Sequence, residues 1–200
     1  MMRPISRRRA IAGIAGTIAV PGCSRKPKPG AEPRVSIVRA SGYTQELYGI
    51  VRRLVERSGL SVRGRRVVVK PNLVEFDPGT SINTHPVLVH AVVEAFRALG
   101  AGEVRIAEGP GHRRVTWDLA EAAGYFSVVP EFERIFTDLN LDDIARVSLR
   151  SNRSRLGSLY FPKTVLGCDL LVSVPKMKTH HWVGATLSMK NFFGLVTGGV

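Results

Sequence analysis

The amino-acid sequence predicts an α/β domain with an open, mainly parallel sheet and helices on both faces. Short β-branched segments alternate along the chain with longer segments whose apolar residues recur at helical spacing. Two of the short segments, 67–69 (VVV) and 170–174 (LLVSV), are almost continuously apolar, as strands covered on both faces are. The alternation and the apolar runs together favour parallel strands joined by helices.

The elements can be expected in a strand–helix order. The segment 34–39 (RVSIVR) is short and β-branched, which predicts a first strand. Residues 43–57 have helical spacing and end before Ser58-Gly59, which predicts a helix. The apolar residues of its expected buried face are Leu47, Ile50, Val51, Leu54 and Val55. The second strand is expected at 66–70 (RVVVK).

The following segments continue this order. A helix should begin at Pro86, a favoured first-turn residue, with Thr84 as its cap, and should end before Gly100. A third strand is expected at 103–107 and a third helix at 116–123. The pattern then weakens, with 141–145 weakly helical and a predicted hairpin between 147–150 and 158–161. The buried strand 170–174 is the last strand expected in the domain, which extends over residues 34–200.

Length and composition fit one globular domain. The chain has 200 residues, of which 44% are hydrophobic and 22% charged. The formal net charge is +13, but four of the arginines lie among the first nine residues, so about +9 remains for the rest of the chain. The other basic residues are scattered among acidic ones, without a basic run interleaved with aromatic residues. Nucleic acid is therefore not an expected partner.

Residues 1–22 have the features of an export signal peptide. Arg7-Arg8-Arg9 precede an apolar stretch of about ten residues, which is short for a membrane span. The paired arginines resemble a twin-arginine signal, and Val20-Pro21-Gly22-Cys23 resembles a lipoprotein box, in which Cys23 would be lipidated. Residues 23–33 would then be a tether. We expect an exported protein of the cell envelope or periplasm, anchored to the membrane if Cys23 is lipidated.

The cysteine content restricts the chemistry. Cys168 is the only cysteine besides Cys23. Two cysteines can form neither a disulfide framework nor a cysteine-ligated zinc or iron–sulfur site within one chain.

Polar residues follow three of the predicted strands. Lys70 and Asn72 follow the second strand and Glu108 follows the third, while the segment 175–182 (PKMKTHHW) follows the last. Ligands bind beyond the carboxyl ends of the strands in open parallel sheets. We therefore expect these side chains to converge at one edge of the sheet.

The segment 175–182 carries the strongest chemical signal. Lys176 and Lys178 alternate in an extended segment and would point to the same side, together with His180. Two ammonium groups and an imidazole on one side repel one another, which favours a bound carboxylate or phosphate. Lys178 and His180 are candidate proton-transfer groups. The alternative is a solvated loop with incidental charges. Binding of a divalent metal by Glu108, His85 or His180 is a further possibility that the sequence leaves open.

Three blocks of this sequence resemble a known family. The blocks 67–74 (VVVKPNLV), 84–111 and 169–198, the last with a K-x-K-T-H and an L-x-x-K-N-x-x-G pattern, resemble a prokaryotic domain family of unknown function. The resemblance implies that the following residues occupy family positions: Lys70, Asn72, Thr84, Glu108, Lys176, Lys178, Thr179, His180, Lys190 and Asn191.

The resemblance also sets expectations about partners and extent. Members of the family are often associated with ferredoxin-type iron–sulfur modules, which implies a redox partner. This chain lacks clustered cysteines, so no iron–sulfur cluster of its own is expected. The family pattern continues beyond Val200, which implies a shortened or truncated domain.

Two functional hypotheses follow. The first is an enzyme that acts on a small anionic substrate, with proton transfer by Lys178 and His180 and with the other family positions binding the ligand. The second is a non-catalytic, lipid-anchored protein that binds an anionic ligand or assembles with a redox partner. The sequence names neither a reaction nor a cofactor.

Overall fold

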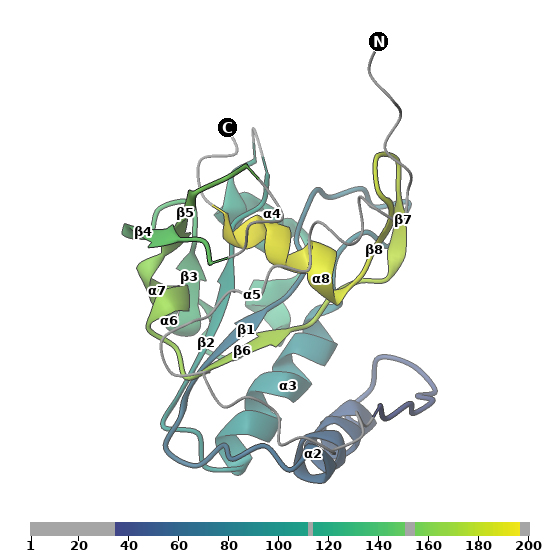
Figure 1. Ribbon diagram of the computed structural model, residues 1–200. Helices are drawn as coiled ribbons and strands as arrows, with labels where there is room; N and C mark the ends of the chain where they lie inside the picture. Colours follow the sequence, from purple (N-terminus) through teal and green to yellow (C-terminus); the bar gives the residue numbers. More distant parts are fainter. Residues whose placement is uncertain (1–34, 112–113, 151–154, 197–200) are drawn as a thin grey trace.

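The computed structural model describes residues 35–111, 114–150 and 155–196 (Figure 1). A four-stranded parallel sheet with the strand order β3-β2-β1-β6 forms its centre. The strands are β1 (Arg66–Lys70), β2 (Glu103–Glu108), β3 (Phe136–Asp138) and β6 (Leu170–Ser173). Because all four run in the same direction, their carboxyl ends meet at one edge of the sheet, where Lys70 pairs with Ser173.

One face of the sheet is covered by helices. They are α2 (Glu46–Ser58), α3 (Pro86–Ala98), α4 (Thr116–Ala122), α5 (Tyr125–Val128) and α6 (Phe132–Ile135). Val67, Val69 and Ile106 of the sheet pack in one core with Phe96 and Tyr125 of the helices. Each of these five side chains is at most 2% exposed, and burying one large apolar side chain contributes about 1.5–3 kcal/mol.

The opposite face is covered by shorter elements. These are the antiparallel hairpin of β4 (Ile144–Ser148) and β5 (Ser158–Pro162), α7 (Lys163–Leu166), α8 (Ser188–Asn191) and the 3₁₀ helix η1 (Phe192–Leu195). Val68 and Ala107 of the sheet pack there against Phe161, Val165 and Leu195. The alternating apolar side chains of β1 therefore enter two cores. The α/β class with a parallel sheet and helices on both faces is confirmed.

A second hairpin follows the sheet. β7 (Lys178–His180) pairs antiparallel with β8 (Gly184–Thr186), and neither strand joins the central sheet. In Figure 1 this hairpin extends away from the body of the domain at the upper right. It is the direct continuation of β6, so the sequence 175–182 leaves the sheet edge and turns back toward α8.

Most of the predicted elements are confirmed, with three corrections. Residues 35–39 form no strand, and Val35 and Ile37 are 84% and 92% exposed. β-branched residues form a strand only where a neighbouring strand accepts their backbone hydrogen bonds, and the described sheet provides none there. His85, not Thr84, caps α3. Residues 141–145 contain the start of β4 instead of a helix, while the predicted β4–β5 hairpin is confirmed.

The N-terminal predictions lie outside the described residues. This applies to the export signal, to the tether at 23–33 and to lipidation of Cys23. Within the described residues, no helix has both the length and the apolar character that a membrane span requires.

Candidate functional site

A buried ion pair lies at the carboxyl ends of β1 and β2. Lys70 Nζ donates a hydrogen bond of 2.5 Å to Glu108 Oε1, and the two side chains are 1% and 2% exposed. The backbone N–H groups of Leu73 and Gly109 donate to the two carboxylate oxygens, at 2.9 and 3.0 Å. A buried carboxylate is stable only with such partners. Both carboxylate oxygens of Glu108 therefore already accept hydrogen bonds from other groups of the chain.

The C-terminal segment covers this ion pair. Asn191, in α8, accepts a bond from Lys70 Nζ at 3.4 Å. Its Nδ2 group donates to the Lys70 carbonyl at 3.1 Å and to Ser173 Oγ at 3.0 Å. At Gly194 in η1, an added Cβ would lie 3.2 Å from Lys70 Nζ and 3.3 Å from Glu108 Oε1. In the K-N-x-x-G pattern, the asparagine thus binds both Lys70 and Ser173, and the glycine leaves room for the two charged groups.

Thr84 and Asn72 join the exits of β1 and β6. The Thr84 hydroxyl donates to the Val174 carbonyl at 2.7 Å and accepts from the Asn72 N–H at 2.9 Å. The buried Tyr125 hydroxyl donates to the Thr84 carbonyl at 2.8 Å. Thr84 therefore holds the loop after β1 in place. Asn72 is also buried, and its Oδ1 atom has no hydrogen-bond partner among the described residues.

Lys178 lies half-buried on β7, beside this network. Its Nζ donates to the Ile82 carbonyl at 2.9 Å. Burial is the largest cause that lowers the pKa of Lys178. Other charges act on this pKa as well: Glu75 and Glu108 raise it, and Lys190 and Lys176 lower it. The net effect favours the neutral amine more than in an ordinary lysine.

Lys190 is a second half-buried ammonium group. It lies on α8, and its Nζ is 4.9 Å from the centre of the Phe193 ring. Burial lowers its pKa first, and the charge of Lys70 lowers it further. Among the described residues, no salt bridge joins Lys178 or Lys190 to a carboxylate. The charge of Lys190 is also one of the causes that lower the pKa of Lys178.

Lys176 belongs to a neighbouring cluster. Its Nζ lies 3.3 Å from the Tyr43 hydroxyl, and the Tyr43 ring stacks on His85 at 4.0 Å between centroids. His85 Nδ1 accepts a bond from the Val87 N–H at 3.2 Å, which leaves Nε2 as the protonated nitrogen of the neutral ring. Burial, followed by the charge of Lys176, lowers the pKa of His85. His85 therefore acts as a neutral helix cap.

The remaining candidates lie on the β7–β8 hairpin. His180 follows Lys178 by two residues, so the strand places both on one face, while Thr179 points to the other and is exposed. His180 Nδ1 accepts from the Trp182 N–H at 3.2 Å. Burial lowers the pKa of His180, and the charges of Lys190, His181 and Lys178 lower it further. The lowered pKa and the acceptor role of Nδ1 both favour the neutral imidazole.

The described residues contain no group of three or more His, Cys, Asp or Glu side chains placed to bind a metal ion. Glu108 forms an ion pair, His85 caps a helix and His180 lies on the hairpin. A metal site built from these three candidates gains no support from this arrangement.

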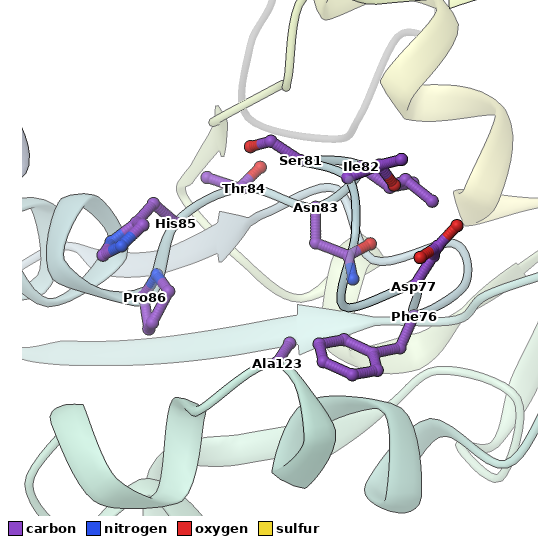
Figure 2. A pocket seen from close by; sticks show the side chains of 10 residues that line it. Phe76, Asp77, Ser81, Ile82, Asn83, Thr84, His85, Pro86 and Ala123 are labelled. Atoms are coloured by element: carbon purple, nitrogen blue, oxygen red, sulfur yellow. The ribbon is translucent and has the colours of Figure 1, made fainter.

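A hollow of about 170 Å³ lies beside the loop after β1. In Figure 2, His85 and Pro86 stand at one end of it, and Phe76 and Asp77 stand at the other. The lining contains no lysine or arginine, so the hollow offers no positive charge to an anion. Its lining includes Ile82, whose carbonyl accepts from Lys178. The hollow thus borders the lysine cluster without containing it.

The structure brings most of the sequence candidates to one sheet edge, in two sets. Lys70, Asn72, Thr84, Glu108 and Asn191 form the buried network, and Lys178, Lys190 and His180 lie over it with partial exposure. Sequence reasoning missed Gly194, Ser173, Tyr43 and the Ile82 carbonyl. The glycine ending the K-N-x-x-G pattern was a signal for Gly194. No sequence signal indicates a backbone carbonyl such as that of Ile82.

Comparison with known proteins agrees with the family expected from the sequence blocks. Residues 67–199 match the family described as Domain of unknown function (DUF362). The chain is also similar to the Thylakoid-associated protein sll1697 of Synechocystis sp., with 28% identity over 170 residues, which cover 82% of this chain and 51% of that protein. It thus spans about half the length of this curated relative. No solved structure matches the chain. Because the family match covers more than half of the chain, the protein belongs to the family described as Domain of unknown function (DUF362).

Proposed function

We propose that the protein binds a small anionic ligand, a carboxylate or a phosphate, between the ammonium groups of Lys178 and Lys190. The observation that carries this proposal is a pair of half-buried lysines whose pKa values are both lowered, without a salt bridge to a carboxylate in the described residues. An anion between them would relieve the repulsion and replace the lost solvation. The buried Lys70–Glu108 pair and Asn191 form the buried network next to these two lysines.

The same arrangement suits Lys178 to proton transfer. A lysine with a lowered pKa holds less of its proton at neutral pH and can act as a general base once it is correctly oriented. His180 lies on the same face of β7, and its lowered pKa favours the neutral imidazole, so it can exchange a proton with a bound ligand. We therefore favour an enzyme that abstracts a proton from, or returns one to, a small anionic substrate.

Calorimetric titration tests the binding proposal. Inorganic phosphate and succinate serve as probes at low ionic strength. Lys178→Met and Lys190→Met should each weaken binding of the preferred probe by about 10–100-fold, since a charged hydrogen bond is worth about 1.5–3 kcal/mol. Lys163→Met is the matched control, because Lys163 is 61% exposed and pairs with Asp143 at 3.0 Å. It should leave binding unchanged.

Two results would contradict the proposal. One is that Lys163→Met weakens binding of the probe as much as Lys178→Met or Lys190→Met does, which would indicate an unspecific attraction of the anion to a basic protein. The other is the absence of binding of both probes at millimolar concentrations by a folded wild-type chain.

A second candidate is a non-catalytic protein that holds an anionic ligand or a redox partner at the cell envelope. The bond from Lys178 to the Ile82 carbonyl favours it, because the amine acts there as a hydrogen-bond donor, whereas a general base has to accept a proton. The export signal, the lipid anchor on Cys23 and an iron–sulfur partner belong to this proposal. Lys178→Arg separates the two candidates: it keeps the charge and should preserve ligand binding, but it should abolish turnover that depends on proton transfer.

A further inference from the structure

The last part of the described chain combines exposed apolar side chains with positive charge. From Leu170 onward the sequence contains no aspartate or glutamate, but three lysines and two histidines. Trp182 stands in the turn between β7 and β8 and is 85% exposed, and its neighbour Val183 is 51% exposed. Phe193, in η1, is 68% exposed. Exposed large apolar residues in a cationic segment mark a site of interaction.

Ring contacts, a cation–π contact and the electrostatic effect of Lys190 on His180 connect these side chains into one surface. The Trp182 ring lies 4.9 Å from that of His181 and 6.4 Å from that of His180. The charge of Lys190 acts on His180, and Lys190 Nζ lies over the Phe193 ring. We call the surface formed by residues 180–183, Lys190 and Phe193 the apolar–cationic surface. It runs from the tip of the β7–β8 hairpin to the C-terminal helices.

We propose that this surface docks onto a membrane that contains anionic lipids, with Trp182 and Val183 inserted at the level of the headgroups. Tryptophan is enriched at membrane–water interfaces, because its ring is apolar and its N–H is polar. Lys190, which lies over Phe193 on the same surface, is attracted to the negative surface of anionic lipids, and the segment from Leu170 onward has no carboxylate to oppose it.

The shape of the surface favours a lipid partner over a protein groove. Trp182 and Val183 sit at the end of a hairpin that extends away from the domain (Figure 1), so these two residues form a protrusion and not a concave site. A protruding tip with an aromatic side chain can enter the headgroup layer without any rearrangement of the sheet. The inference rests on the exposure of Trp182 and shares Lys190 with the ligand site proposed above. Trp182 is not part of that ligand site, so a test at Trp182 can fail while the ligand proposal stands, and the reverse.

Vesicle co-sedimentation tests this proposal on the full chain. All samples carry Cys23→Ser, so that no acyl chain can contribute, and all keep the same N-terminal segment, so that its contribution cancels. Binding to phosphatidylcholine vesicles with phosphatidylglycerol should exceed binding to pure phosphatidylcholine. Trp182→Ser should weaken it by about tenfold, since burying one large side chain is worth a factor of this order. Leu141→Ser is the control: Leu141 is 79% exposed, lies outside the segment and should have no effect.

Fluorescence gives a second readout. The chain has two tryptophans, so Trp117→Phe leaves Trp182 as the only reporter. Its emission should shift to the blue on addition of anionic vesicles and should be quenched by brominated acyl chains. The proposal would be overturned if the Trp182→Ser variant bound vesicles as strongly as the chain that keeps Trp182. It would also be overturned if the emission of Trp182 did not shift on addition of anionic vesicles. A shift that depends on protein concentration without vesicles would also overturn it, because a second copy would then cover the surface.

Discussion

At the scale of single residues, Lys70 and Glu108 carry opposite charges in a place that water does not reach. Each side chain is at most 2% exposed, and each has the other as its charge partner. Removing one member of such a pair leaves a buried charge, whereas a surface pair is worth little. We therefore expect the two residues to stabilise the fold around the site, and to affect ligand binding only through this stabilisation.

A double-mutant cycle measures this role. Lys70→Met should lower the free energy of unfolding by about 3–5 kcal/mol, because Glu108 then lacks its ammonium partner. The double variant Lys70→Met, Glu108→Gln should lose clearly less than the sum of the two single variants. Urea denaturation gives all four values. The exposed pair Lys163–Asp143 is the control and should show a coupling of about 0–1 kcal/mol. Additive losses at Lys70 and Glu108 would refute the coupling.

Lys178 leads to a prediction about pH. Its pKa is lowered in the folded chain, first of all by burial, so the folded protein binds fewer protons than the unfolded one between that pKa and the ordinary value for lysine. Stability contributed by this group must therefore rise with pH across this window. The wild type should gain stability relative to Lys178→Met as the pH rises toward 10.5, the ordinary pKa of a lysine, as measured by urea denaturation at each pH. A loss over the same interval would show that the fold stabilises the ammonium form.

At the scale of elements, the position of the C-terminal helices α8 and η1 determines how much space the buried pair of Lys70 and Glu108 has. Gly194 lets η1 approach the Lys70 ammonium and the Glu108 carboxylate, since a Cβ there would lie within 3.3 Å of both. This distance is shorter than ordinary van der Waals contact, and the buried partners have little freedom to move. A larger residue must push η1 away from the sheet edge.

Gly194→Val should therefore destabilise the protein by about 1–3 kcal/mol through overpacking. Gly157→Val is the matched control, because an added Cβ at Gly157 meets nothing within 4 Å. The control should change stability by less than about 0.5 kcal/mol. Thermal denaturation followed by circular dichroism compares the two variants. Similar losses at both positions would mean that Gly194 matters only for its backbone.

The elements also show what the sequence could and could not predict. The continuous apolar run of β1 and the Pro86 start of α3 were sufficient to predict both, because an apolar run and the preference of proline for the first helical turn can be recognised locally in the sequence. Residues 35–39 have strand composition but no strand, because pairing depends on distant partners. For the same reason the sequence could bring Lys70 and Glu108 to one edge but could not predict that they bond to each other. The contact of Lys178 with a loop carbonyl was equally inaccessible.

At the scale of the whole molecule, the sheet topology explains why residues far apart meet. β1 lies between β2 and β6, so the exits of all three strands adjoin. The loop after β1 carries Thr84 to the exit of β6, and the segment after β6 returns through the β7–β8 hairpin to α8. The supporting network and the lysines above it therefore come from the beginning, the middle and the end of the domain.

The contact between Asn191 and Lys70 has a consequence for how this protein is made. Their positions differ by 121 in the sequence. A ribosome releases the amino end first, so the lysine and its carboxylate partner emerge long before the asparagine and the glycine that will cover them. The nascent polypeptide must keep the Lys70–Glu108 pair uncovered until Asn191 and Gly194 have also left the ribosome, so this edge of the sheet cannot close when only its first strands have emerged.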